Sequence, residues 1–275
     1  MTVKFTKFAG LAAASALGAA LLAVPALADG MARRGSIKDP VAAPAPRACA
    51  LSANVALTSE YVFRGISQTD EGPAIQGGFD ATCGIFYAGV WASSLDFGGD
   101  FAGNDVANIE IDLYAGIKPK TGPVTWDIGV IYYAYPNSNY PTDLDMVEIK
   151  LGGSAEIWKG GTFGVTGFYS PDYTGELGDV VTVEVGLSQS LPTIGMFTPT
   201  FSALVGHQMG DSADYELAFG DDNYTYWNVG LTLGFLEKWS LDFRYWDTNL
   251  DPVGACGTAL FQCDERFVAT LKFTY

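Results

Sequence analysis

Few residues in this chain have the types and spacing that catalysis requires. The sequence holds one histidine, His207, in the segment VGHQMGD. A serine nucleophile would need this imidazole as its base, with Ser202 or Ser212 as candidates, but no nucleophile motif surrounds either serine. The zinc motif HExxH and the glycine-rich phosphate loop are also missing. We therefore expect no enzyme activity, no cofactor and no metal, and a histidine at a rim or in a polar interior.

Acidic residues recur at every second position in several segments. Glu110 and Asp112 are an example, and this spacing places both carboxylates on one face of a strand. Such pairs act as acid and base in glycoside hydrolysis, but they are ordinary on a water-facing strand. The whole chain has 31 Asp and Glu against 15 Lys and Arg, a net charge of −16. A field of this sign disfavours nucleic acid as a partner and attracts cations.

The four cysteines fall into two pairs along the chain. Cys49 precedes the first expected strand and Cys83 lies in the turn after the second, so both are at the same end of neighbouring strands. Cys256 and Cys263 share the last long loop. We expect the disulfides Cys49–Cys83 and Cys256–Cys263, which suit the oxidising periplasm and cell surface, rather than a thiol-bound metal.

The first residues have the features of an export signal. Lys4 and Lys7 form a positive region, an apolar run rich in Ala and Leu follows, and Ala26-Leu27-Ala28 is a small-x-small cleavage site. A transmembrane anchor would fit the apolar run but not the cleavage site. The chain accordingly divides into a signal peptide at 1–28, a flexible Pro/Ala-rich periplasmic lead at 29–50 and a single β domain at 51–275.

Segments of alternating polarity fill the β domain. In one of them Ile109, Ile111 and Leu113 share a face opposite Glu110 and Asp112. A soluble sandwich would bury the apolar faces, whereas a membrane barrel would turn them toward lipid. The expected strands are roughly 51–63, 74–82, 85–95, 108–118, 124–135, 146–158, 162–170, 180–189, 198–208, 225–235, 239–247 and 266–275.

Three patterns favour the membrane barrel. The connections alternate between short turns, which carry Lys, and long loops, which are acidic. The last strand alternates regularly and ends on the aromatic Tyr275, as in strands that the barrel-assembly machinery reads. Aromatic residues also fall into two bands near the strand ends. The expected bands are Trp126, Trp158, Phe163, Phe235, Trp239 and Phe273 at the short turns, and Tyr61, Phe63, Trp91, Tyr135, Tyr169, Tyr226, Trp227 and Tyr245 at the long loops.

We therefore predict an all-β fold: a closed antiparallel transmembrane β-barrel of about 12 strands, with 10 or 14 as alternatives. Its short turns would be periplasmic and its longer acidic loops extracellular. A soluble lipocalin-like sandwich is the competing fold. The polar faces would line a pore, and the expected charged lining is Glu60, Arg64, Asp80, Glu110, Asp112, Asp127, Glu148, Lys150, Glu156, Glu184, Asp242, Arg244 and Lys272. Acidic groups outnumber basic ones in this set, which predicts a modest cation preference.

Five segments carry a family resemblance. TSEYVFRGISQT, AIQGGFD, YAGVWASSLDF, IEIDLYAG and DIGVIYYAYP resemble, in that order, the TorF family of porins, and they span most of the β domain up to about residue 136. The resemblance implies an outer-membrane barrel of a Gram-negative bacterium. It also implies that Arg64, Gln68 and Gln76, which match signature positions, shape the first outer loop and the lumen.

The sequence thus predicts an outer-membrane channel for passive diffusion of small hydrophilic solutes or ions. The alternatives are a non-conducting structural or surface-interaction barrel and, less favoured, an outer-membrane enzyme. The expected partners are outer-membrane lipid and lipopolysaccharide, the barrel-assembly machinery through the C-terminal strand, and small solutes.

Overall fold

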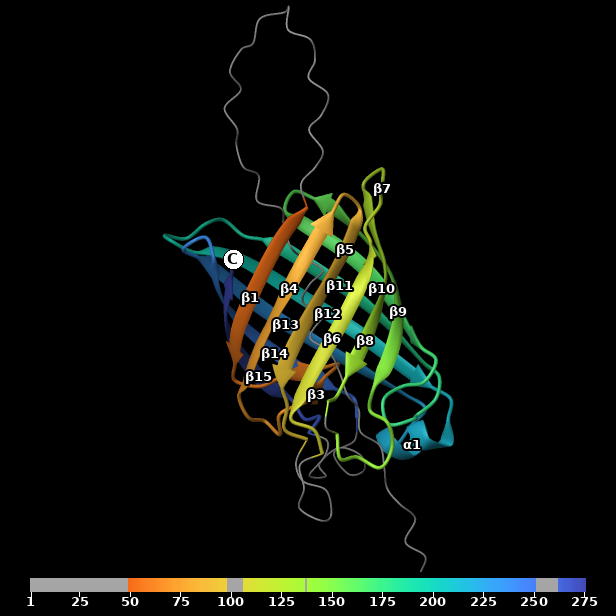
Figure 1. Ribbon diagram of the computed structural model, residues 1–275. Coiled ribbons are helices and arrows are strands. Elements are labelled where there is room, and N and C mark those ends of the chain that lie inside the picture. Colours follow the sequence, from red (N-terminus) through yellow and green to blue (C-terminus); the bar gives the residue numbers. More distant parts are fainter. Residues whose placement is uncertain (1–48, 98–105, 137, 251–261) are drawn as a thin grey trace, which may run out of the picture.

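The computed structural model describes residues 49–97, 106–136, 138–250 and 262–275, and in them a single sheet closes into an antiparallel barrel (Figure 1). The expected signal peptide and most of the expected lead lie outside the described residues. The twelve long strands are β1 (Ala50–Thr58), β4 (Ala74–Cys83), β5 (Phe86–Ser94), β6 (Ile109–Ile117), β8 (Val124–Ala134), β9 (Met146–Trp158), β10 (Gly161–Ser170), β11 (Val180–Ser190), β12 (Thr198–Gly210), β13 (Asn223–Phe235), β14 (Trp239–Thr248) and β15 (Arg266–Thr274).

Two pairings close the sheet. β1 pairs with both β4 and β15, and β6 pairs with both β5 and β8, while a short strand, β7 (Lys120–Thr121), extends the turn before β8. A closed sheet leaves no edge with unpaired backbone groups, which is what a strand structure in hydrocarbon requires. Among the described residues, no helix has the length and apolar character needed to cross a membrane.

The strands turn their apolar faces outward and their polar faces inward, as the alternation predicts. On β11, Val181, Val183 and Val185 are exposed on the outside, whereas Thr182 and Glu184 are buried on the inside. The same pattern recurs around the barrel and leaves a belt of large aliphatic side chains on its outer surface. A soluble protein rarely exposes a continuous apolar surface of this kind, so the belt is the face that meets lipid.

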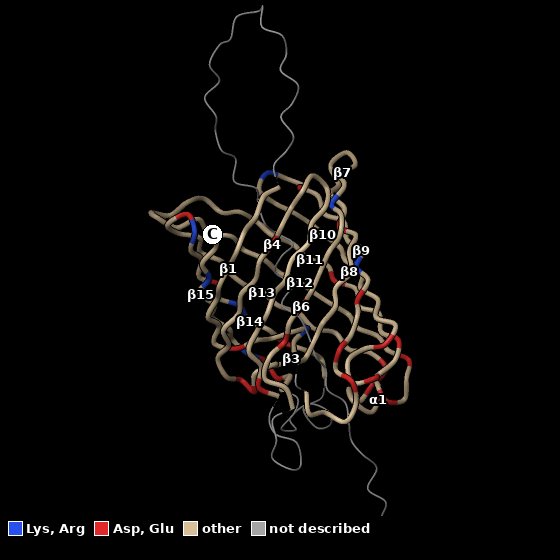
Figure 2. Tube along the Cα trace, viewed as in Figure 1, with Lys and Arg blue, Asp and Glu red and all other residues tan. Residues whose placement is uncertain are grey.

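The two ends of the barrel differ in length of connection and in charge. The turns after β4, β6, β9, β11 and β13 are short, and the intervening connections are long. Several lysine residues lie at the short-turn end, while acidic residues gather at the long-loop end (Figure 2). This confirms the expected alternation, and we call the long-loop end the outer end.

The buried apolar core lies at the outer end, not along the barrel. It combines inward-facing residues at the outer ends of the strands with residues of the long loops. Its fully buried side chains include Tyr173, Tyr215, Tyr224 and Tyr226. Glycines leave room for these rings, since a Cβ at Gly206 would lie 2.1 Å from the Tyr226 ring. Packed side chains therefore fill the outer end of the described barrel.

A short helix, α1 (Ala213–Phe219), covers part of this core. Ser212 caps its first turn by accepting a hydrogen bond from the Tyr215 backbone N–H, and Gly220 ends it with a left-handed φ of 80°. The sequence prediction contained no helix in this loop. Ser212, acidic residues in the first turn and Gly220 are the signals that predict one.

The prediction of a first strand over residues 51–63 is wrong at its outer end. β1 ends at Thr58, and the chain then folds into the barrel as a small hairpin of β2 (Val62–Phe63) and β3 (Ile66–Ser67). Tyr61 and Phe63, expected at the lipid interface, are consequently buried inside.

Tyr135 and Tyr226 are likewise buried in the core, and Trp91 lines the interior cavity, so none of the three lies in an outer aromatic band. The physical reason is that each buried phenol donates a hydrogen bond to a buried carboxylate, at 3.1 Å from Tyr135 to Glu110 and 2.6 Å from Tyr226 to Glu184. Tyr169 and Trp227 keep the exposed positions expected of the band.

The first disulfide is present as expected. Cys49 and Cys83 are bonded, with their Cα atoms 4.5 Å apart, and join the start of β1 to the end of β4 at the short-turn end. Cys263 is also disulfide-bonded. Its expected partner, Cys256, lies outside the described residues.

Candidate functional site

A tight turn brings the β2–β3 hairpin into the barrel. Val62 pairs with Ser67 and Phe63 with Ile66, so Arg64 and Gly65 form a two-residue connection. Both have positive φ, 48° and 85°, which is the geometry of the turns that match the twist of a hairpin. Arginine is uncommon at a positive φ, so its contacts must hold it there. We call residues 62–67 the inner hairpin.

Arg64 fixes the inner hairpin to the barrel wall. Its guanidinium forms an ion pair with Glu148 on β9, at 2.8 Å from Nη1 to Oε1 and 3.0 Å from Nη2 to Oε2. Nη1 also donates to Gln208 Oε1 on β12 at 3.1 Å. Burial opposes the charge, but the Glu148 carboxylate outweighs it, so the pKa of Arg64 lies above its ordinary value. The side chain is 3% exposed and remains a cation.

Aromatic rings and further hydrogen bonds surround this ion pair. The Arg64 guanidinium carbon lies 4.4 Å from the centre of the Phe63 ring and 5.1 Å from that of Phe168. Tyr133 donates to Glu148 Oε2 at 2.8 Å, so the carboxylate has three donors. A buried ion pair of this kind is stable only when its remaining lone pairs are satisfied, and here the tyrosine completes it.

A second set of contacts holds the base of the inner hairpin. Tyr61 donates to Glu110 Oε1 at 3.0 Å, and Glu60 forms an ion pair with Arg266 on β15. Burial first, and the Glu110 charge second, raise the pKa of Tyr61 well above its ordinary value, so the phenol stays neutral and can donate. The hairpin is thus anchored to strands on opposite sides of the barrel.

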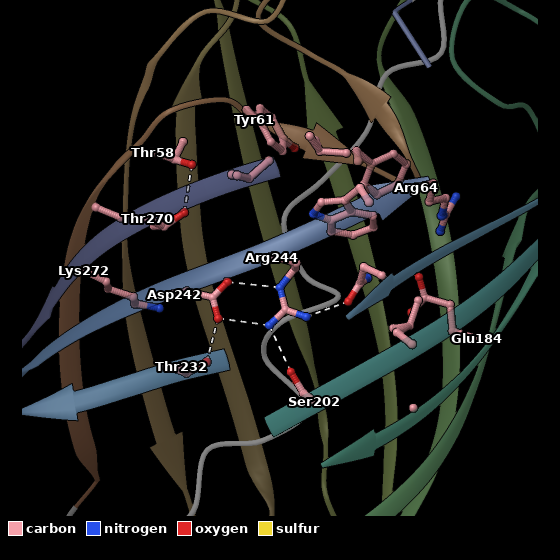
Figure 3. A pocket seen from close by; sticks show the side chains of 18 of the residues that line it. Thr58, Tyr61, Arg64, Glu184, Ser202, Thr232, Asp242, Arg244, Thr270 and Lys272 are labelled. Atoms are coloured by element: carbon pink, nitrogen blue, oxygen red, sulfur yellow. Dashed lines mark hydrogen bonds and ion pairs between the residues drawn. The ribbon is translucent and has the colours of Figure 1, made fainter. Parts of the chain in front are cut away.

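Below the inner hairpin lies a cavity of about 430 Å³ (Figure 3). Arg244 on β14 organises one wall, where it contacts Asp242 at 3.0 Å, Asn228 at 2.6 Å and Ser202 at 3.0 Å. Thr232 donates to the same Asp242 carboxylate at 2.6 Å. Most of the remaining wall consists of hydroxyl, amide and aromatic side chains. The cavity can therefore hold a small polar solute.

The structure divides the expected pore-lining residues into three groups. Those that line the cavity are Glu60, Arg64, Glu184, Asp242, Arg244 and Lys272, together with the signature residue Gln76. Those that are buried outside the cavity lining are Glu110, Asp112, Asp127, Glu148 and Lys150. Those at neither place are Asp80, which accepts from Tyr114, and Glu156, which is exposed at the short-turn end.

The charge of the cavity lining is balanced, with three acidic and three basic residues. The expected acidic excess sits elsewhere, because residues such as Asp127 are neutralised within their own networks. Asp127 accepts from Lys150 at 2.9 Å and from Tyr87 at 2.7 Å. In the described part of the chain, no group of three or more His, Cys, Asp or Glu side chains could hold a metal ion.

Two expected residues take structural positions. Gln68 is fully buried, and its side chain donates to the carbonyl oxygens of Ile66 and Ser67, which braces the inner hairpin. His207 pairs with Thr225 through a 2.9 Å contact from Nδ1 to the hydroxyl, on the outward side of β12. Neither residue lines the cavity.

Sequence reasoning missed several residues that build the site. Gln208, Tyr133 and Tyr226 connect Arg64 and Glu184 to the wall, and Trp91 lines the cavity. The pair Arg64-Gly65 after a short alternating run was the available signal, because Gly at the second position suits a two-residue hairpin turn.

Comparison with known proteins gives the same architecture. The KdgM porin matches with a TM-score of 0.54 and 8% identity over 82% of this chain and 99% of its own. The NanC porin matches with a TM-score of 0.52 and 13% identity over 82% and 98%. At such identities the likeness shows the fold alone. No curated protein matches the sequence.

The fold and the family fix the location of the chain. A closed barrel with an outward apolar belt, similar in fold to porins, is a protein of the bacterial outer membrane. The model of a family described as "Bacterial protein of unknown function (Gcw_chp)" matches residues 42–275. The chain therefore belongs to the Gcw_chp family.

Proposed function

We propose that this barrel is a porin-like channel for passive diffusion of small hydrophilic solutes or ions, related to the TorF porins that its N-terminal half resembles, and not an enzyme. The observation that supports this most directly is the polar cavity of about 430 Å³ inside a closed membrane barrel. Its wall offers hydroxyl, amide and charged groups that replace the hydration of a solute in transit.

The inner hairpin closes the outer end of this channel. Arg64, Glu148 and the surrounding rings fill the space between the cavity and the outer loops. Solute therefore passes when the inner hairpin leaves its docked position, and the strength of the Arg64–Glu148 contact sets how often that happens. Order and disorder of a loop is a common way to gate such a path.

A modest cation preference is part of the proposal, and it rests on the outer loops, not on the cavity. The charges of the cavity lining are balanced, but acidic residues dominate the outer loops (Figure 2). Described examples are Asp70, Glu71, Asp143, Asp172, Glu176, Asp179, Asp211, Asp214, Glu216, Asp221 and Asp222. Their field raises the local concentration of cations at the mouth.

A non-conducting structural or surface-interaction barrel is the second candidate. The observation that favours it is the packed core at the outer end, which leaves the described barrel closed there. In that case the acidic loops would act at the cell surface, by binding divalent cations between themselves and lipopolysaccharide. The two candidates differ in whether purified protein conducts.

Planar-bilayer recording across a KCl gradient separates the candidates. We expect discrete conductance steps and a reversal potential on the cation side, which moves toward zero when the salt on both sides is raised because salt screens the loop charges. Replacing Asp221 and Asp222 by Asn should reduce the preference, whereas the change Lys159→Gln at the short-turn end should not reduce it. Purified protein that inserts but never conducts would support the second candidate.

A further inference from the structure

Two buried polar atoms of the cavity wall have no hydrogen-bond partner in the described chain. They are Arg64 Nε and Glu184 Oε2. Both side chains line the cavity, and they are 3% and 5% exposed. Buried donors and acceptors are paired in the great majority of cases, so an unpaired donor and an unpaired acceptor in one wall call for an explanation. A solute that offers an acceptor to one and a donor to the other provides it.

The two groups are neighbours in the wall. Thr182 and Glu184 point inward from successive inner positions of β11, and Thr182 donates at 3.2 Å to Gln208 Oε1, the atom that also accepts from Arg64. Tyr226 donates to Glu184 Oε1 at 2.6 Å and so leaves Oε2 available. Through Gln208, the Arg64 side chain is therefore linked to Thr182, one inner position from Glu184 on β11.

The surrounding wall combines flat apolar rings with small polar groups. Phe63 and Phe168 lie beside the Arg64 guanidinium, and Trp91 also lines the cavity. Ser202 and Thr232 carry hydroxyls farther from Arg64 (Figure 3). Rings pack against C–H faces, and paired donors and acceptors suit hydroxyls, each of which donates and accepts. A sugar-like solute presents both surfaces.

The local charges select against anionic solutes. Glu148 already neutralises Arg64, and Asp242 neutralises Arg244. Neither guanidinium is therefore an unpaired cation that would attract an anionic solute. Glu184 adds a carboxylate beside them. Lys272, the remaining cation of the lining, lies toward the short-turn end of β15. A carboxylated solute at the Arg64–Glu184 position would meet like charge.

We propose that the cavity contains a binding site for a small neutral polyhydroxylated solute, the size of a mono- or disaccharide, in which Arg64 Nε donates to one hydroxyl and Glu184 Oε2 accepts from its neighbour. The site deepens the proposed channel function by naming the class of solute, and it rests on that function only for its physiological role. Binding itself requires no conductance.

Equilibrium titration of the purified full chain in detergent tests the site. Glucose, sucrose and glucuronate serve as probes, and tryptophan fluorescence reports occupancy because Trp91 and Trp246 line the cavity. We expect a saturable change with glucose or sucrose, at least tenfold weaker binding of glucuronate, and loss of the signal when both tryptophans are replaced by Phe. Glu184→Gln keeps an acceptor for Tyr226 but replaces Oε2 by a donor, and should weaken sugar binding by about tenfold.

The matched control is Glu216→Gln on the exposed face of α1, which removes the same charge outside the cavity and should bind sugar normally. Equal or tighter binding of glucuronate, no saturable change with either sugar, or unaltered binding by Glu184→Gln would overturn the site. Each variant is first checked for the heat-modifiable gel mobility of a folded barrel. Conductance without sugar binding overturns only the site, and sugar binding without conductance overturns only the channel.

Discussion

Replacing Glu148 by alanine should open the outer end of the barrel. The change leaves the Arg64 guanidinium buried without its carboxylate, although Gln208 and two rings still surround it. Removing one partner of a buried ion pair costs roughly 3–5 kcal/mol, which favours the state in which Arg64 leaves the interior. In planar bilayers we expect more frequent and longer conductance steps than for the unaltered protein.

A double variant shows whether the ion pair itself is responsible. Arg64→Met combined with Glu148→Met removes both charges and fills the space with flexible apolar side chains. Neutralising both partners of such a pair is often without cost, so the inner hairpin should dock again and conductance should fall back. If the single variant conducts no more than the parent, the inner hairpin is not the closing element.

Arginine in place of Val183 should destabilise the barrel strongly in lipid. Val183 lies two residues from the centre of β11 and faces outward with 38% of its surface exposed. A cation on the lipid face near the bilayer midplane costs about 2–4 kcal/mol, whereas at the interface it costs about 1 kcal/mol or less. We expect the free energy of unfolding, measured by urea titration of barrels in vesicles, to fall by the larger amount.

Leu191→Arg is the control for this substitution. Leu191 is 40% exposed, close to the value of Val183, but it lies in the short turn after β11. Its replacement should cost little. Equal effects of the two substitutions would contradict the assignment of the belt to lipid.

The sequence predicts the barrel well because its evidence is local. Alternation places Leu113 outside and Asp112 inside from spacing alone, and the order of short and long connections gives the end to which each strand points. The prediction of the first strand fails at the position where a contact with a residue distant in the sequence determines the path of the chain. Nothing near Tyr61 in the sequence shows that a carboxylate 49 residues later, Glu110, draws the ring inward.

For the candidate site, the sequence predicts which side chains point into the barrel but not which side chains contact one another. Arg64 and Glu148 were both expected to point inward, yet their separation of 84 residues hides the ion pair between them. For the same reason the balance of charge in the cavity could not be read from the count of inward residues. Glu148 and Asp127 look like free lumen carboxylates in the sequence, and in the structure each is neutralised by a basic side chain.

A reversible tether between the inner hairpin and the wall tests the central claim most directly. A Cβ at Gly65 would lie 3.6 Å from the Thr248 Cβ on β14, which is within the range of about 3.5–4.5 Å found in disulfides. The full chain carrying Gly65→Cys and Thr248→Cys would be recorded in planar bilayers before and after a reductant. The controls are the unaltered protein, Thr248→Cys, and Gly65→Cys, which shows the effect of a side chain at the positive φ of 85° without the tether. We predict that the oxidised double variant is silent, that reductant restores its conductance steps, and that the controls conduct throughout. Conductance that is the same in the oxidised and reduced double variant would contradict a channel closed by the inner hairpin.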